Sequence, residues 1–421
     1  MSPARKRGSR SRPVRRELLC VVAALSAWTL GIAGTAPDAS AADQRSKQWY
    51  LDALHAEDMW KVTTGKGIKV AVIDSGVNPS TPSLKGQVLT GVDATTEGGG
   101  GSTADTNGQG TTTAELIAGT GKGGGLRGLA PGAKIIPIKL PLLKHDELPQ
   151  INDPLKRAIR AAADSDAQII NISIGNEHAI GLDMFGQHSA LEYALSKGKL
   201  LVAGTGDNAK KGNKPQYPAA FPEVVGVGSA DREGAVTAES QHGTTVSVAA
   251  PGQDIPRWCD ATFQSYCDDG GGSTTAAALF SASAALVWSV HRDWTANQVL
   301  RAIFDTASRD ASKKSLSNYY GHGLIRPREI ILNGKGNPGP PDAKLRADEV
   351  YPVASPSTSP SPSASASAQP EKGKPGSEAV VAGSAEKTSD DGQLGLIFGG
   401  VAVVVVLAGG TFAVLRRRRT A

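Results

Sequence analysis

Short runs of β-branched residues alternate with helical patterns through the middle of this chain, and this alternation limits the possible folds more than any other feature. The strand-like runs cover residues 68–73, 133–138, 167–174, 200–203, 224–227 and 245–249, and the helical patterns cover 112–118, 155–163 and 189–196. Strands alternating with helices form βαβ units, in which helices cover both faces of a parallel sheet. We therefore expect an α/β domain with a mostly parallel, doubly wound sheet.

Two further helices are expected toward the end of this domain. Residues 274–290 are almost all apolar, which is typical of a helix inside a core. Residues 294–307 are amphipathic, and Thr295 is a suitable N-cap. The sequence thus assigns residues 42–335 to one folded domain of a usual size for an α/β fold.

The two ends of the chain predict export and membrane anchoring. Basic residues and then an apolar stretch precede Ala39-Ser40-Ala41, which is a typical signal-peptidase site. Residues 1–41 are therefore predicted to be a secretory signal peptide, and an uncleaved anchor is the alternative. Residues 393–415 are uncharged and long enough to span a bilayer, and the arginine-rich tail 416–421 follows. This predicts a single-pass protein of the cell membrane, with its folded domain outside and its C-terminus in the cytoplasm.

Residues 336–392 are rich in Pro, Ser, Ala, Lys and Glu, with too few apolar side chains to form a core. We expect a disordered linker. In a largely polyproline-like conformation, at about 3.1 Å per residue, it would reach on the order of 170 Å. That reach would hold the folded domain well clear of the bilayer.

Most of the positive charge lies at the two ends of the chain. The first 17 residues carry a net charge of +6 and the last six carry +4, against +5 for the whole, so the remainder carries −5. The basic pI therefore does not indicate nucleic-acid binding. Nothing in the sequence predicts a cofactor.

Two cysteines, Cys259 and Cys267, lie outside the predicted signal peptide. Both fall on the exported side of the membrane, where disulfides persist, so we expect them to pair and close a small loop. A zinc site is the weaker alternative, because no histidine is near these two cysteines. We predict no metal site.

Three segments carry the residues that matter most for function. Residues 70–77 are predicted to be a buried strand that ends at Asp74 in a tight turn, a geometry in which a carboxylate can orient a base. Gln109 follows 35 residues later, and Thr274 opens the apolar helix after another 165. In order and spacing, these segments resemble the Asp, His and Ser blocks of the subtilisin-like serine proteases, the subtilases.

Further blocks extend this resemblance over roughly residues 48–333. They are residues 128–133, 171–175, 217–222 and 249–252. The resemblance implies a three-layer subtilisin-like fold, with Ser173, Ile174 and Gly175 on the edge strand of a substrate cleft. The chain's ends, its linker and residues 48–51 are most similar to the mycosins, membrane-anchored proteases associated with type VII secretion. That similarity implies membrane components of such a system as partners.

The chemistry of the triad differs from that of the family. Where the family has histidine, this chain has Gln109, whose carboxamide cannot take a proton near neutral pH. Thr274 replaces the nucleophilic serine and keeps a hydroxyl, but its methyl group is stiff and crowds the approach to a carbonyl. Without an imidazole to orient, Asp74 is expected to be a structural turn carboxylate. The triad is thus predicted to be inactive.

The oxyanion position also departs from the family. Asp207 stands where the family has an asparagine donor, and an ionised carboxylate repels the charge that develops there. A shift of one residue would give this role to Asn208, and that alternative stays open. The sequence His242-Gly243-Thr244 matches the family's missing tripeptide, but it lies far along the chain from position 109, so we interpret His242 as a loop residue.

Two hypotheses follow for function. The first is a membrane-anchored pseudoprotease that binds an extended peptide by strand addition without cutting it. The alternative is a serine-type endopeptidase in which Thr274 works with an unrecognised base. A subtilisin-like fold does not decide between them, because fold does not establish activity.

Overall fold

The computed structural model describes residues 44–95, 101–141, 152–177, 182–308 and 316–341. The predicted signal peptide, transmembrane helix and cytoplasmic tail lie outside the described residues, as does the linker beyond residue 341.

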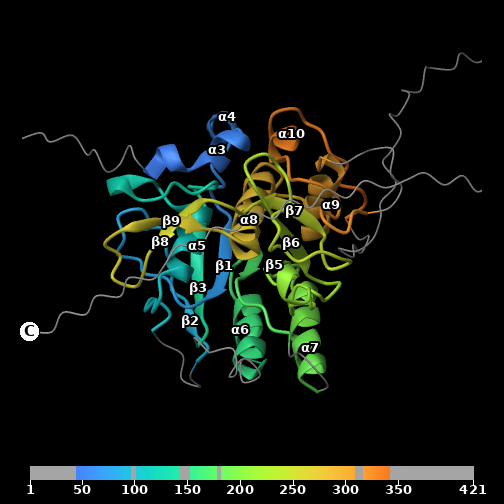
Figure 1. The fold of residues 1–421 in the computed structure, drawn as a ribbon. Helices are drawn as coiled ribbons and strands as arrows, with labels where there is room; N and C mark the ends of the chain where they lie inside the picture. The colour runs from blue at the N-terminus through green and yellow to red at the C-terminus, as the bar shows by residue number, and fades with distance from the viewer. Residues whose placement is uncertain (1–43, 96–100, 142–151, 178–181, 309–315, 342–421) are drawn as a thin grey trace, which may run out of the picture. The chain divides into compact units, whose positions relative to one another are not determined.

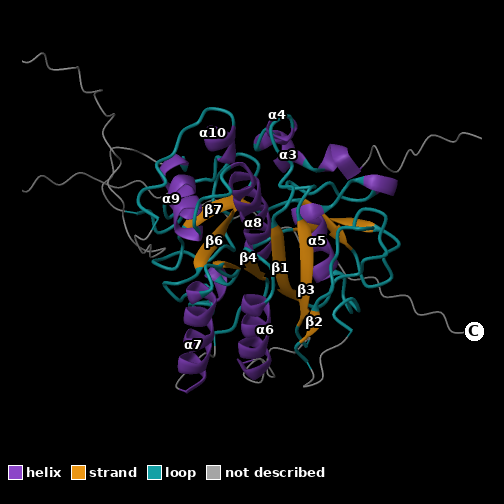
Figure 2. Ribbon diagram, turned by 180° about the vertical axis from the view of Figure 1, so that it is seen from behind, coloured by secondary structure: helices purple, strands orange, loops and turns teal. Residues whose placement is uncertain are grey.

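A seven-stranded parallel sheet forms the centre of the domain (Figures 1 and 2). In spatial order its strands are β2 (Val92–Asp93), β3 (Lys134–Lys139), β1 (Lys69–Asp74), β4 (Ile169–Ile172), β5 (Leu200–Gly204), β6 (Val225–Ala230) and β7 (Val248–Pro251). Each neighbouring pair is parallel. Because parallel strands end at the same edge of a sheet, the residues that follow β1, β4 and β5 gather at one edge.

Helices cover both faces of the sheet (Figure 2). On one face lie α5 (Gln109–Ala118), α8 (Ser273–Val290) and α9 (Ala296–Thr306), and on the other lie α6 (Asn152–Asp164) and α7 (Leu182–Ser196). Within β1 the side chains alternate: Val70 and Val72 join the first core cluster, and Ala71 and Ile73 join the second. The predicted three-layer, mostly parallel α/β fold is confirmed.

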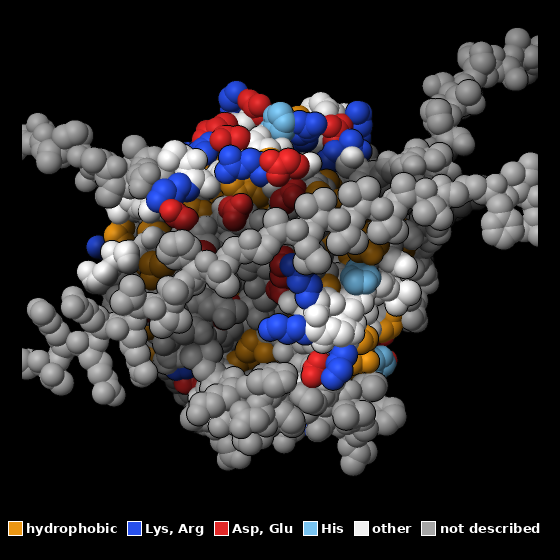
Figure 3. All heavy atoms as spheres, viewed as in Figure 1, with side chains coloured by type: hydrophobic (Ala, Val, Ile, Leu, Met, Phe, Trp, Pro, Cys, Tyr) orange, Lys and Arg blue, Asp and Glu red, His pale blue; other side chains and the backbone are white. Residues whose placement is uncertain are grey.

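Among the described residues, several short helices, two 3₁₀ turns and a hairpin lie outside the main sheet and its covering helices. They are α3 (Trp49–Ala53), α4 (Ala56–Trp60), α10 (Pro327–Ile331), the 3₁₀ turns η1 (Lys122–Gly124) and η3 (Ala209–Lys211), and an antiparallel hairpin of β8 (Ile255–Trp258) and β9 (Tyr266–Gly270). On the face shown in Figure 3, side chains of both charges mix over α3 and α4. Exposed pairs there, such as Arg45 with Asp52 at 2.6 Å, contribute little to stability.

The central helix, α8, is buried along nearly its whole length. Every residue from 276 to 288 is buried, which explains its almost continuous apolar sequence. Among the described helices, α8 is also long and apolar enough to cross a membrane, but 78% of its 18-residue window is buried in the domain. We therefore assign it to the core.

The predicted N-cap of the next helix is confirmed, although α9 begins at Ala296 instead of residue 294. The Thr295 hydroxyl accepts a hydrogen bond from the Gln298 backbone N–H at 3.3 Å, and the Gln298 side chain accepts one from the Thr295 N–H at 3.0 Å. This reciprocal pair is a capping box.

The β8–β9 hairpin carries the two cysteines. Cys259 and Cys267 are joined by a disulfide across the hairpin loop, with their Cα atoms 5.1 Å apart. The sequence predicted the pairing but not the two strands beside it.

We expect a digest of the unreduced protein to contain Cys259 and Cys267 in one disulfide-linked peptide pair. Mass spectrometry with and without reduction measures this directly, and the reduced digest is the control. Alkylation of both thiols before any reduction would contradict the pairing.

Candidate functional site

The three triad positions meet at the edge where β1, α5 and α8 come together. Asp74 ends β1, Gln109 begins α5, and Thr274 is the second residue of α8. Two glycines permit this approach. A side-chain carbon on Gly110 would lie 2.0 Å from the Gly76 carbonyl oxygen, and one on Gly204 would lie 2.7 Å from the Thr274 nitrogen. Larger residues at either position would push these segments apart.

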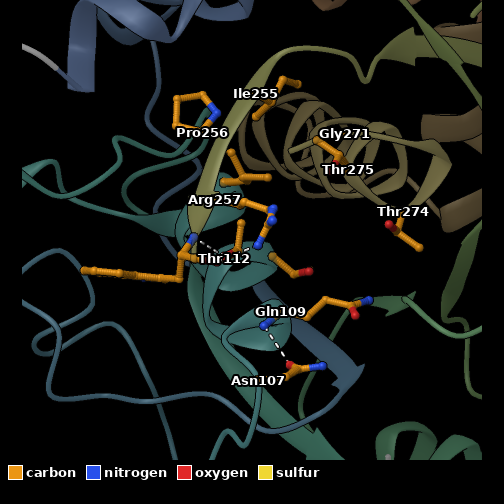
Figure 4. Close-up of a pocket in the computed structure, with 12 residues that line it drawn as sticks. Asn107, Gln109, Thr112, Ile255, Pro256, Arg257, Gly271, Thr274 and Thr275 are labelled. Atoms are coloured by element: carbon orange, nitrogen blue, oxygen red, sulfur yellow. Dashed lines mark hydrogen bonds between the residues drawn. The ribbon is translucent and has the colours of Figure 1, made fainter. Parts of the chain in front are cut away.

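Gln109 and Thr274 line the same pocket, which has a volume of about 310 Å³ (Figure 4). In Figure 4 the Gln109 side chain extends from α5 toward the start of α8. The other lining residues are Asn107, Thr112, Thr113, Leu116, Ile255, Pro256, Arg257, Trp258, Gly271 and Thr275. The β8–β9 hairpin, which the sequence did not predict, therefore forms one wall of the site. Of the histidines in the described residues, none lines this pocket.

Asp74 is buried beneath the pocket. Its carboxylate accepts hydrogen bonds from the Ser75 N–H at 2.7 Å and from the Thr113 hydroxyl at 3.0 Å. Burial raises the pKa of Asp74 to about 6, and these hydrogen bonds oppose that rise. Thr113 also lines the pocket, so it connects the buried Asp74 to the pocket wall. These contacts suit the structural role expected for Asp74.

Gln109 is exposed at the start of α5. Its side-chain amide lies 3.5 Å from the Ser173 carbonyl oxygen, which is at the outer limit of a hydrogen bond. Its backbone N–H donates to the Asn107 side chain at 2.9 Å. A neutral amide in this position can donate or accept a hydrogen bond, but it cannot remove a proton from a hydroxyl.

Asp105 holds the start of α5, a role that the sequence analysis missed. Its carboxylate accepts hydrogen bonds from the Ser75 hydroxyl, from the Asn107 and Gly108 backbone, and from the backbone and hydroxyl of Thr111, at 2.6 to 3.1 Å. The signal was present in the sequence, because the Asp105-Thr106-Asn107-Gly108 segment is rich in residues typical of turns. Asp105 therefore fixes the position of Gln109 relative to β1.

Thr274 is partly buried, and its hydroxyl has no hydrogen-bond partner among the described residues. Asp207 instead bonds the preceding residue, Ser273. The Asp207 carboxylate accepts from the Ser273 backbone N–H at 3.0 Å and from its hydroxyl at 3.1 Å. A carboxylate at a helix N-terminus stabilises the unpaired N–H groups there. The structure thus gives Asp207 a capping contact that the sequence did not predict.

The side chain of Asn208, the alternative oxyanion donor, points elsewhere. Its amide donates to the Lys214 carbonyl at 2.9 Å. Neither Asp207 nor Asn208 lines the pocket that Gln109 and Thr274 share. Loss of hydration raises the pKa of the Asp207 carboxyl, and the hydrogen bonds from Ser273 oppose this rise.

The predicted cleft residues Ser173, Ile174 and Gly175 follow β4. Ser173 is buried, and its hydroxyl accepts from the Asn171 side chain at 3.1 Å. The backbone N–H groups of Ile174 and Gly175 donate no hydrogen bond within the described residues. Unpaired backbone groups at such an edge are what strand addition requires.

His242 lies in a loop away from the pocket. Its backbone N–H donates to the Asn213 side chain at 3.0 Å, and its ring stacks on Tyr319 with the centroids 4.9 Å apart. These contacts support its interpretation as a loop residue.

A second residue missed from the sequence is Glu115, which is fully buried in α5. It accepts hydrogen bonds from the Thr81 hydroxyl at 2.7 Å and from the Tyr266 hydroxyl at 2.6 Å. Burial raises the pKa of Glu115 to about 7, and both hydrogen bonds oppose that rise. Glu115 therefore connects α5 to the β8–β9 hairpin and titrates in the neutral range.

We expect Glu115 to make stability fall as the pH rises. Its pKa in the folded state is raised to about 7 from an ordinary value of 4.5, so between these values the folded state binds more protons than the unfolded state. The stability contribution is therefore complete below about pH 4.5 and is lost toward about pH 7. The Glu115→Gln variant has no carboxyl group to ionise at this position, so it should not show this loss of stability. Urea unfolding of both proteins at about pH 5 and about pH 8 should show the variant gaining on the wild type at the higher pH. An equal difference at both pH values would contradict the assignment.

The parallel sheet and the placement of positions 74, 109 and 274 indicate a subtilisin-like protein. Comparisons of this chain with known proteins agree. The subtilase family model matches residues 65–323, more than half of the chain, so the chain belongs to the subtilase family.

The individual relatives include a bacterial serine proteinase and mycosins. A thermophilic serine proteinase of Bacillus sp. (strain AK1) is 35% identical over 200 residues, which are 47% of each chain, so this chain spans about half of that relative. Mycosin-1 of Mycolicibacterium smegmatis is 28% identical over 364 residues, covering 75% of this chain and 78% of the relative. The crystal structure of MycP1 from the ESX-1 type VII secretion system matches with a TM-score of 0.60 and 26% identity, over 71% of this chain and 89% of that one. The chain thus has a mycosin-like protease fold.

Proposed function

We propose that this protein is a membrane-tethered pseudoprotease, whose cleft binds an extended polypeptide without cutting it. The observation that carries the proposal is the carboxamide of Gln109 at the position of the catalytic base. Thr274 shares the pocket and keeps a hydroxyl, but no group beside it in the described pocket can take the proton. Asp74 is bonded to Thr113 and has no imidazole to orient.

Binding by strand addition is supported by the edge that follows β4. The N–H groups of Ile174 and Gly175 are available to a peptide backbone. The pocket between Gln109 and Arg257 is then in position to take one of the peptide's side chains. In this proposal the cleft that cuts a polypeptide in an active protease only binds one here.

We further propose that the domain acts at the outer face of the cell membrane as a component of a type VII secretion system. Support comes from the likeness to mycosin-1 and to MycP1, whose structure is described as that of a type VII secretion component. It also comes from the predicted signal peptide, the Pro/Ser-rich linker and the uncharged stretch 393–415. Membrane components of the secretion system are the partners we infer.

The proposal is tested by measuring cleavage and binding together on the purified exported domain. We expect extended peptide pools to bind, as followed by fluorescence anisotropy, and to remain intact by mass spectrometry after prolonged incubation. Thr274→Ala is the matched control for cleavage, because it removes the only candidate nucleophilic hydroxyl that we assign. Cleavage by the wild type that Thr274→Ala abolishes would establish the alternative, a working endopeptidase.

A further inference from the structure

A second pocket, of about 340 Å³, adjoins the first and is acidic. Four carboxylates line it, those of Asp207, Glu239, Asp254 and Asp269, together with the backbone of residues 270–272. Gly271 lines both pockets, so the two lie next to each other beside the start of α8.

Two of the four carboxylates are already paired with cations. Glu239 pairs with Lys210, and Asp269 pairs with Arg257 at 3.1 Å. Asp254 has no ion pair among the described residues. Asp207 is bonded to the uncharged Ser273. The pocket therefore keeps negative charge from Asp207 and Asp254 that the surrounding described residues do not balance.

An independent observation also indicates a ligand here. Ser229 is fully buried and lines this pocket, and its hydroxyl has no hydrogen-bond partner among the residues that the structure describes. A buried polar group without a partner destabilises the fold, so buried hydroxyls are normally hydrogen-bonded. The space beside it is kept open by Gly252, where a side-chain carbon would lie 2.5 Å from the Ser229 oxygen.

The arrangement favours an organic cation over a metal ion. Among the described residues, no three His, Cys, Asp or Glu side chains lie close enough together to hold a metal. Carboxylates spread around an open pocket instead suit an ammonium or guanidinium group on a flexible stem, which has several donors to satisfy. The Ser229 hydroxyl can accept one of these donors.

We propose that this acidic pocket binds a lysine or arginine side chain of the polypeptide that lies in the adjoining cleft. The inference rests on the proposed peptide-binding function and names the chemical class of the ligand. A chain that passes Gly271 would place one side chain near Gln109 and Thr274 and a cationic one beside Asp207 and Asp254.

The test uses the exported domain and three peptide pools that are identical except at one central position, which is lysine, norleucine or glutamate. Charged hydrogen bonds contribute about 1.5–3 kcal/mol, so the lysine pool should bind at least about tenfold more tightly than the norleucine pool. Asp254→Asn should remove this preference. That variant should fold, because residue 254 has φ 50°, a conformation that asparagine tolerates. Glu192→Gln, on the exposed surface of α7, is the control and should keep the preference.

A second variant separates binding from stability. Ser229→Ala removes an unpaired buried hydroxyl, so we expect the protein to be at least as stable while it binds the lysine pool several-fold more weakly. Equal binding of all three pools would overturn the inference and leave the proposed function standing. Failure of every pool to bind would overturn both. A lysine preference that survives Asp254→Asn and Ser229→Ala would show that the cation binds elsewhere.

Discussion

A Gln109→His, Thr274→Ser double variant is expected to gain weak peptide hydrolysis, whereas we expect none from the wild type. The two changes restore a base and an unhindered nucleophile beside the buried Asp74. Activity should remain weak, because Asp207 still places a carboxylate beside the start of α8. Cleavage of a labelled peptide pool measures the gain, and Gln109→His with Thr274→Ala is the control that has the base but no nucleophile.

Adding Asp207→Asn to the double variant should raise hydrolysis by about 10² or more, the usual scale of one oxyanion donor. Asparagine can still accept a hydrogen bond from Ser273, so the start of α8 should keep its cap. A triple variant that folds normally, yet neither cleaves peptide nor reacts with a serine-directed probe, would mean that the geometry of the site has changed along with its chemistry. The alignment at positions 74, 109 and 274 would then be wrong.

Phe280→Ala is expected to lower the free energy of unfolding by about 3–5 kcal/mol. Phe280 is fully buried in α8 and belongs to the core cluster on that face of the sheet, so its removal leaves a cavity. Val290→Ala, at the end of the same helix and 39% exposed, is the matched control and should cost far less. Urea unfolding measures both variants. A loss from Phe280→Ala no larger than that of the control would contradict the central place of α8 in the core.

The sheet and its main helices could be predicted because their apolar periodicity is strong. The run at 68–73 became β1, and the apolar stretch at 274–290 became α8 with one residue added at its start. Boundaries were less accurate. The helix predicted from residue 112 begins at Gln109, because the hydrogen bonds of Asp105 order residues whose own helix propensity is low.

The β8–β9 hairpin could not be predicted from the same signals. Its strands are four and five residues long, and only one residue of β9 is buried, so neither strand has a clear alternation of apolar and polar residues. The contacts of Asp207 with Ser273, and those of Glu115 with Tyr266, join residues 66 and 151 positions apart. Such contacts depend on the folded arrangement, and sequence spacing does not reveal them.

The sequence predicted the chemical groups of the site better than it predicted the shape of the pockets. Gln109 is identifiable by its position relative to Asp74, and the structure places it in one pocket with Thr274. The acidic pocket beside it combines carboxylates from four separate segments with a buried serine, so only the fold brings it together.

Labelling of the wild-type protein by a fluorophosphonate probe tests the central claim most directly, because the probe reacts with a hydroxyl that a neighbouring base has activated. We predict no adduct on Thr274 at neutral pH, and an adduct at this position in the Gln109→His, Thr274→Ser variant measured alongside. Intact-protein mass spectrometry reads out both. An adduct on wild-type Thr274 that disappears in Thr274→Ala would contradict the pseudoprotease and establish an active enzyme.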